Sequence, residues 1–239
     1  MAQKVTLGVC TSGTRLKLAA LAGGRLSQAQ RKVFNQELAL FPLARRVLAG
    51  ADAGLRSVGT VCAVRGPGRF TGIRIALTLA GSLKALAGAR VLTVTLFETL
   101  ACQAASTPHF RRWAAAAPGG RLAVLLHAFK DEFFCQLFRP DLRPAGEPAW
   151  LKEPELRALL AAEKNVYAVG DAEEYPGIYS LLPPGALRAP AAVSKVLPAW
   201  IIRACQARGS ASLRPLYLKP AKYELQNNIS YRGRGGRAG

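Results

Sequence analysis

The sequence predicts a two-lobed, duplicated α/β fold with mixed sheets. Two observations carry this prediction. Each half of the chain begins with two adjacent apolar segments separated by a short turn, and each pair is followed by a helical pattern and a further strand. The chain of 239 residues is also long enough to bury a real core, as one large domain or as two lobes.

The first lobe opens with a predicted hairpin. Apolar runs over 5–9 and 15–21 flank the turn 11–14 and predict two strands. Apolar residues then recur at helical spacing, which predicts a helix over 27–49 with Ser27 or Asn35 as its cap. Pro42 is expected to kink this helix or to mark where its regular part begins.

A strand–helix–strand unit follows. A short buried strand is predicted over 58–64, and a helix rich in Ala, Leu and Ile over 71–87. Gly88 ends that helix before a strand over 90–95.

The junction between strand 58–64 and helix 71–87 contains the most informative motif, Gly66-Pro67-Gly68-Arg69-Phe70-Thr71-Gly72-Ile73-Arg74. Gly66 and Gly68 permit positive φ and Pro67 fixes its own φ, so the turn is stiff. Thr71 and Gly72 can open a helix whose free N–H groups face the loop, a geometry able to hold an anion. The motif lacks the Lys-Ser/Thr ending of a P-loop, so we favour a structural junction over a phosphate cradle.

The second half repeats the pattern. The expected elements are a helix over 97–105, a loop region over 106–120 around Trp113, strands over 122–126 and 132–138, a turn-rich connection over 140–148, a helix over 153–163, a strand over 165–170 and a helix over 194–208. We expect an N-terminal lobe over 1–105 and a smaller lobe over 106–220, whose last helix packs back on the first lobe. The basic segment 221–239 is expected to be disordered.

Charge and cysteine usage limit the class of protein. The formal net charge of +19 favours acidic partners, above all nucleic acid, although a general bias towards Arg, Ala, Gly and Pro explains it equally well. Five scattered cysteines without a Cys-x-x-Cys pair indicate reduced thiols in a cytoplasmic protein. An uninterrupted apolar run of about 18 residues and a secretory signal are both missing, so we expect no membrane association.

The chain resembles a known family at these motifs. The glycine loop matches the GPGSFTGLR of the TsaB family, also called the YeaZ type, with Arg69 for Ser and Ile73 for Leu. Residues 7–12 resemble the opening L-x-x-D-T-S strand, residues 91–100 the V-x-G-V-S-S-L-E-A-L segment, and residues 216–220 the closing P-x-Y-L-R-P. The family belongs to the two-lobed actin, sugar-kinase and Hsp-seventy-like (ASKHA) superfamily.

The resemblance implies a non-catalytic subunit of a bacterial tRNA-modifying complex. Such proteins pair with TsaD, which binds ATP and transfers threonylcarbamoyl to adenosine 37 of tRNAs that read ANN codons, and a TsaE-type ATPase joins the complex. Contact with tRNA would come through that complex, and a homodimer is possible when TsaD is absent. The pairing would use helices 35–49 and 71–87, and the implied contact residues are Phe34, Leu38, Phe41, Arg45, Ile75, Leu79 and Leu83. The apolar stripes among them are also compatible with ordinary core.

Two departures from the pattern of ATP-hydrolysing relatives are informative. Cys10 and His127 stand where such relatives place carboxylates, and a thiol and an imidazole are poor ligands for Mg²⁺. His109 and His127 are the only histidines and cannot form an H-x-x-x-H metal motif. We therefore expect no catalytic residue, metal or cofactor, with Cys10 as a small buried thiol and His127 as a packed imidazole.

Other functions stay open on the sequence alone. One is an ATP-dependent kinase or acyl-transferase of the same superfamily, and another is a glycoprotease, which would need a metal or nucleophile constellation that the sequence does not show. A third is a stand-alone basic RNA-binding module, in which Arg69, Arg74 and the terminal Arg-Gly segment would contact phosphate.

Overall fold

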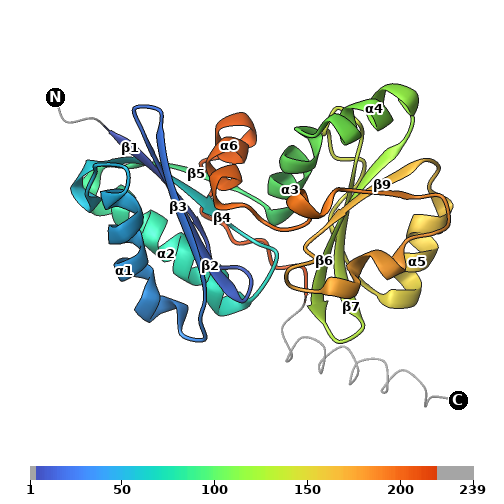
Figure 1. Ribbon diagram of the computed structural model, residues 1–239. Helices are drawn as coiled ribbons and strands as arrows, with labels where there is room; N and C mark the ends of the chain where they lie inside the picture. The colour runs from blue at the N-terminus through green and yellow to red at the C-terminus, as the bar shows by residue number, and fades with distance from the viewer. Residues whose placement is uncertain (1–3, 220–239) are drawn as a thin grey trace, which may run out of the picture.

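The computed structural model describes residues 4–219, which form two lobes side by side, each built on a five-stranded mixed sheet (Figure 1). The first sheet has the order β3-β2-β1-β4-β5 and contains β1 (Val5–Cys10), β2 (Arg15–Ala22), β3 (Arg25–Lys32), β4 (Val58–Val64) and β5 (Arg90–Val94). The second has the order β8-β7-β6-β9-β10 and contains β6 (Arg121–Phe129), β7 (Glu132–Phe138), β8 (Ala149–Lys152), β9 (Val166–Gly170) and β10 (Leu187–Arg188).

The two sheets have the same topology. In the first, β3, β2 and β1 pair antiparallel, and β4 and β5 continue from β1 in parallel. In the second, β8, β7 and β6 pair antiparallel, and β9 and β10 continue from β6 in parallel. The predicted duplicated α/β fold with mixed sheets is therefore confirmed.

Helices separate and cover the sheets. They are α1 (Gln36–Ala49), α2 (Phe70–Ala87), α3 (Leu96–Ala105), α4 (Pro108–Ala116), α5 (Glu153–Ala162) and α6 (Pro198–Arg208), with short 3₁₀ helices η1 (Leu55–Ser57), η2 (Pro176–Leu181) and η3 (Ala191–Val193). Figure 1 shows α1 and α2 on the outer face of the first sheet, α3 and α6 between the two sheets, and α5 on the outer face of the second. The result is a layered molecule in which α6 contacts the first sheet and α3.

The alternation of side chains along each central strand builds these layers. Leu7 and Val9 of β1 belong to the apolar cluster under α1 and α2, whereas Cys10 belongs to the cluster between the sheets. Gly8 also faces α6, and a Cβ at Gly8 would lie 2.9 Å from Ile202 Cγ1. Glycine at this position therefore allows α6 to pack closely on β1.

Two expected elements need correction, and one short strand was missed. The helix expected over 27–49 begins only at Gln36, because Arg25–Lys32 forms the edge strand β3. β3 is mostly exposed, so it has no buried face to reveal its period. Residues 106–120 contain α4 instead of a loop, and its start carries a Thr107 side-chain cap followed by Pro108. The short strand β8 was not predicted.

Helix α2 is the one helix within residues 4–219 that is long and apolar enough to cross a membrane by length and composition. It packs against β4 through residues such as Ile73, Ala76 and Ala80, which are buried in the first lobe. The fold therefore explains the buried side of α2, while only 28% of the helix is buried. The basic segment 221–239 lies outside the described residues.

Candidate functional site

The glycine loop, residues 66–72, leaves β4 and enters α2. The Gly66–Pro67 peptide bond is cis, Gly66 has a φ of 117°, and a Cβ there would lie 2.5 Å from the carbonyl oxygen of Leu216. Gly68 has a φ of 150°, and its Cβ would lie 2.4 Å from the carbonyl oxygen of Ser12. Both backbone conformation and space therefore demand glycine at these two positions.

The first turn of α2 packs on the turn between β1 and β2. The Thr11 hydroxyl donates to the Gly72 carbonyl oxygen at 2.5 Å, and the Arg69 N–H donates to the Ser12 carbonyl oxygen at 2.8 Å. A Cβ at Gly72 would lie 1.9 Å from the Thr11 carbonyl oxygen. We propose that the glycine loop seats α2 against this turn, with Phe70, Thr71 and Arg74 left exposed on the outside.

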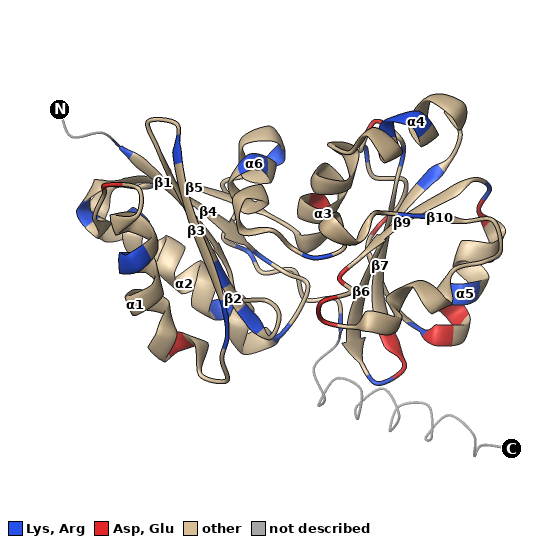
Figure 2. Cartoon of the chain, viewed as in Figure 1, with Lys and Arg blue, Asp and Glu red and all other residues tan. Residues whose placement is uncertain are grey.

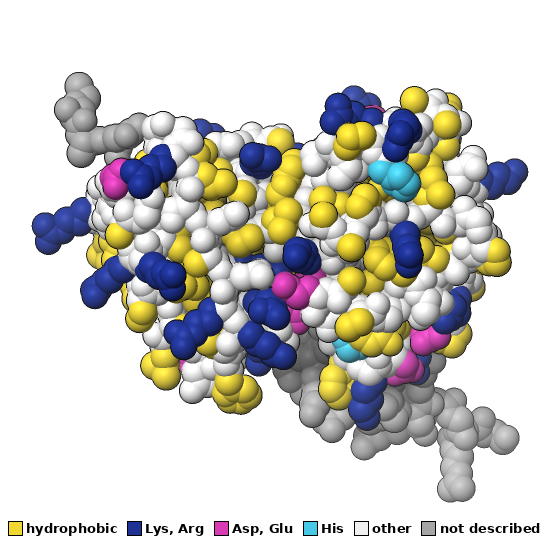
Figure 3. Space-filling view, in the orientation of Figure 1, with side chains coloured by type: hydrophobic (Ala, Val, Ile, Leu, Met, Phe, Trp, Pro, Cys, Tyr) yellow, Lys and Arg dark blue, Asp and Glu magenta, His cyan; other side chains and the backbone are white. Residues whose placement is uncertain are grey.

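An exposed apolar face lies on α1 and the residues before it. Phe34 is 89% exposed, Leu38 72% and Phe41 50%. Leu38 and Phe41 are three positions apart in α1, so they lie on one side of the helix, and Phe34 lies just before the helix begins. Hydrophobic side chains reach the surface in this region of the molecule (Figure 3). These exposed apolar side chains form a candidate contact surface.

The part of this face expected on α2 needs one correction. Leu79 is only 5% exposed and belongs to the core under the first sheet. Ile75 and Leu83 are half-buried beside it, and Arg45 on α1 is exposed. Leu86, which is 87% exposed near the end of α2, is an apolar surface residue that the sequence analysis missed. Its position near the end of the helix carried no distinct sequence signal, because α2 is apolar on most sides.

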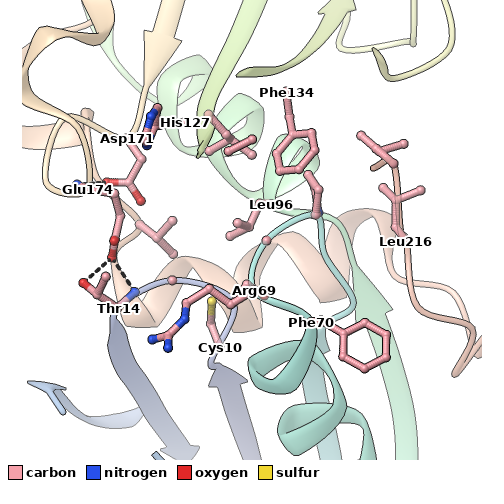
Figure 4. Close-up of a pocket in the computed structure, with 18 of the residues that line it drawn as sticks. Cys10, Thr14, Arg69, Phe70, Leu96, His127, Phe134, Asp171, Glu174 and Leu216 are labelled. Atoms are coloured by element: carbon pink, nitrogen blue, oxygen red, sulfur yellow. Dashed lines mark hydrogen bonds between the residues drawn. The ribbon is translucent and has the colours of Figure 1, made fainter. Parts of the chain in front are cut away.

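A cleft of about 1220 Å³ lies between the two lobes. Its walls come from the β1–β2 turn and the glycine loop on one side, from the end of β6 and the segment after β9 on the other, and from residues 216–219 (Figure 4). Cys10 and His127, which the sequence places at equivalent positions of the two lobes, both line this cleft. The apolar wall is formed by Leu96, Leu126 and Phe134 among others.

Cys10 is buried, and His127 packs against neighbouring groups. Burial raises the pKa of the Cys10 thiol above its ordinary value, which disfavours the reactive thiolate. The His127 ring stacks on Tyr175 with centroids 4.5 Å apart, and its Nε2 lies 2.9 Å from the Lys130 carbonyl oxygen. Among residues 4–219, no three His, Cys, Asp or Glu side chains group closely enough to hold a metal ion.

Asp171 is a buried charged residue of the cleft that the sequence analysis missed, as it also missed Lys17 and Glu174. It directly follows β9, is 5% exposed and lines the cleft. Burial raises the pKa of its carboxyl group to about 6, the positive charge of Lys17 opposes that rise, and Glu174 and Glu173 add to it. An acidic residue at the end of a buried strand was the available sequence signal.

A polar cluster joins the lobes at one end of the cleft. Lys17 of β2 is 2% exposed, and its ammonium donates to Glu173 at 2.7 Å and to the Val196 carbonyl oxygen at 3.0 Å. Arg15 and Gln30 also contact Glu173, at 3.3 Å each. Glu174 accepts from the backbone N–H of Thr14 at 2.9 Å. We call this cluster the interlobe clamp, because each contact joins the first lobe to the part of the chain between β9 and α6.

Replacing Asp171 by asparagine is expected to change the pH dependence of stability. The raised pKa means that Asp171 binds a proton more tightly in the folded protein than in the unfolded chain, so its contribution to stability falls as pH rises from about 4 to above 6. Asp171→Asn removes this loss. As the pH rises over that range, the free energy of unfolding of the variant should therefore increase by up to about 3 kcal/mol relative to that of the wild type. Urea unfolding at several pH values measures the difference, with Asp141→Asn as an exposed control. A pH-independent difference would contradict the burial of an ionisable Asp171.

Part of this chain is similar to a known family of proteins. A family model described as TsaD, tRNA N6-adenosine threonylcarbamoyltransferase, matches residues 35–139, from the start of α1 to the end of β7. A sequence comparison with curated proteins finds no match.

Two solved structures share the fold over 90% of this chain and 100% of their own. One is YeaZ from Pseudomonas aeruginosa, 23% identical with a TM-score of 0.66. The other, described as an uncharacterized protein with similarity to peptidase YEAZ from Pseudomonas aeruginosa, is 24% identical with a TM-score of 0.64. The chain therefore has the YeaZ fold over most of its length.

Proposed function

We propose that this chain is a TsaB-type subunit that pairs with a TsaD-type protein and supports threonylcarbamoylation of adenosine 37 in ANN-decoding tRNAs. The YeaZ fold and the TsaD-family match support a role in this tRNA modification. In this proposal a TsaE-type ATPase joins the larger complex, tRNA is contacted through it, and the protein works in the cytoplasm without a membrane. A homodimer through the same face is the alternative state when the partner is absent.

The observation that carries the pairing is the exposed apolar face of Phe34, Leu38 and Phe41. Large apolar side chains at this exposure gain free energy when a partner covers them, and aromatic residues dominate the binding energy of protein interfaces. The glycine loop supports the same assignment, because it fixes α2 on the sheet next to α1. We propose that the partner surface is formed by α1, including Arg45, together with Ile75, Leu83 and Leu86 of α2.

The chain itself is proposed to be non-catalytic. The cleft has a buried thiol at Cys10 and a stacked imidazole at His127 in the places where ATP-hydrolysing relatives use carboxylates. The cleft does contain two carboxylates, Asp171 and Glu174. Glu174 is part of the interlobe clamp, whose contacts hold the lobes together, and the charge of Lys17 in the same clamp acts on Asp171. An ATP-dependent kinase or acyl-transferase is therefore the less favoured reading.

Phe41→Asp is expected to prevent pairing without unfolding the protein. A carboxylate at a desolvated contact has no partner there, so the dissociation constant for the TsaD-type protein should rise about thirtyfold or more. Size-exclusion chromatography and calorimetry of the mixture measure the effect, and circular dichroism checks the fold.

Phe129→Asp is the matched control, because Phe129 is 57% exposed but lies at the cleft rather than on α1. It should bind the TsaD-type protein like wild type. Leu79→Asp, at a buried position, is expected to unfold the first lobe instead. Normal pairing by folded Phe34→Asp and Phe41→Asp proteins would show that the partner surface is misplaced.

A further inference from the structure

Three exposed aromatic rings gather at the mouth of the interlobe cleft. Phe70 is 55% exposed, Phe129 57% and Tyr217 42%, and all three line the cleft. They come from distant parts of the chain, namely the start of α2, the end of β6 and the segment after α6. Figure 4 shows the Phe70 ring at the edge of the cleft, beyond its apolar wall. Neither the proposed partner surface on α1 nor the interlobe clamp involves these rings.

Each part of this group combines a ring with a cation. Phe70 stacks on Tyr217 with centroids 4.9 Å apart, and the Arg74 guanidinium carbon lies 5.0 Å from the Phe70 centroid. The ammonium groups of Lys130 and Lys219 lie 5.4 and 5.5 Å from the Phe129 centroid. We call the rings Phe70, Phe129 and Tyr217 with the cations Arg74, Lys130 and Lys219 the aromatic ledge.

The two halves of the ledge are close together. Tyr217 and Lys219 are two residues apart, so their Cα atoms are separated by at most about 7 Å. Tyr217 belongs to the Phe70 stack and Lys219 to the Phe129 group, so this short segment joins them. The charge of Lys219 is partly offset by an ion pair with Glu132, and Asp131 is next to Lys130 in sequence. Arg74 and Lys130 are exposed.

The surrounding field also favours an anionic partner. The chain has a net charge of +19, and Lys and Arg are distributed over both lobes (Figure 2). A positive surface that also presents stacked aromatic rings is the arrangement that binds single-stranded nucleic acid, because every base has a π-face and every nucleotide a phosphate. A protein partner is less well matched, since lysine is depleted at the core of protein interfaces.

We propose that the aromatic ledge binds a single-stranded segment of RNA. Bases stack on the Phe70–Tyr217 pair and on Phe129, and phosphates lie near Arg74 and Lys130. Duplex RNA does not fit this chemistry, because its paired bases are not free to stack on side chains. The inference rests on the proposed function only in taking the RNA to be tRNA, since the ledge belongs to this chain alone.

The test measures binding of short labelled oligouridylate and oligoadenylate RNA to the full-length protein by fluorescence anisotropy. Phe70→Ser and Phe129→Ser should each weaken binding about fivefold or more, because each removes a stacking platform. Phe129→Tyr keeps the ring and should bind like wild type. Arg74→Gln should reduce the slope of log affinity against log salt by about 0.7, the value for one phosphate of a single strand.

Phe34→Ser is the matched control, because it removes an exposed ring from the proposed partner surface. It should weaken pairing with the TsaD-type protein and leave RNA affinity unchanged, whereas Phe70→Ser and Phe129→Ser should do the reverse. This crossed design separates failure of the ledge from failure of the proposed function. The ledge proposal is overturned if the wild-type protein does not bind single-stranded RNA, or if it binds duplex RNA of the same length equally well. It is also overturned if the folded Phe70→Ser and Phe129→Ser proteins bind RNA like wild type, or if these variants lose only the protein partner.

Discussion

Glu173→Ala is expected to lower the free energy of unfolding by about 3 kcal/mol, because it leaves the Lys17 ammonium without its main partner in a buried site. The Lys17 side chain is 3% exposed, so water cannot replace the lost carboxylate. Burial raises the pKa of Glu173, but the hydrogen bond and charge of Lys17, followed by the charge of Arg15, hold it below the usual value. The Val196 carbonyl and the charge of Asp171 compensate Lys17 only in part.

The measurement is urea unfolding at neutral pH. The Arg25–Asp52 pair is the matched control, because its side chains are 61% and 72% exposed. Arg25→Ala should therefore cost less than about 1 kcal/mol. The double variant Lys17→Met, Glu173→Ala should recover much of the lost stability, since it removes both charges. Equal losses for Glu173→Ala and Arg25→Ala would contradict a structural role for the interlobe clamp.

Gly72→Ala is expected to be the most disruptive single-methyl change in the glycine loop. The added Cβ would lie 1.9 Å from the carbonyl oxygen of Thr11, which is backbone and cannot rotate away. Either α2 or the β1–β2 turn must then shift, and the Thr11 hydrogen bond to Gly72 is strained as well. We expect a loss of about 3 kcal/mol or more, above the usual range for overpacking.

Gly81→Ala provides the comparison in the same helix. Its added Cβ would meet only Leu213 Cδ1, at an ordinary 3.9 Å. Since alanine is favoured over glycine in a helix interior, this variant should gain roughly 0.5–1 kcal/mol. Thermal unfolding followed by circular dichroism distinguishes the two variants. A Gly72→Ala protein as stable as Gly81→Ala would show that the loop does not seat α2 as described.

Much of the fold could be predicted because local patterns and the final packing agree. The hairpin 5–21, the strand 58–64 and the helix after the glycine loop each have a clear apolar period and clear end signals. The edge strand β3 has no such period, since only one face of it contacts the protein and most of its residues are exposed. The residues of β3 were therefore joined to the helical pattern that follows them, and the predicted helix began too early.

The candidate site was less predictable, because it depends on contacts between distant segments. Lys17 and Glu173 are 156 residues apart, and nothing local in either segment indicates their ion pair. Leu79 was assigned to the partner surface because it is spaced four residues from Ile75 and Leu83. In a helix that is apolar on most sides, that spacing does not reveal which residues face the sheet. Asp171 follows a buried strand, but its burial in the cleft depends on the pairing of β9 with β6, which the local sequence does not indicate.

We expect this chain to support the activity of a TsaD-type partner through the α1 surface. The most direct test is the amount of threonylcarbamoyladenosine formed in tRNA by a reconstituted TsaD-type and TsaE-type system with and without this protein. We predict that the modification requires this chain. Folded Phe41→Asp should leave the modification at the level seen without the chain, whereas Phe129→Asp should still pair with the partner. Equal modification with and without the protein, or full activity of Phe41→Asp, would contradict the account.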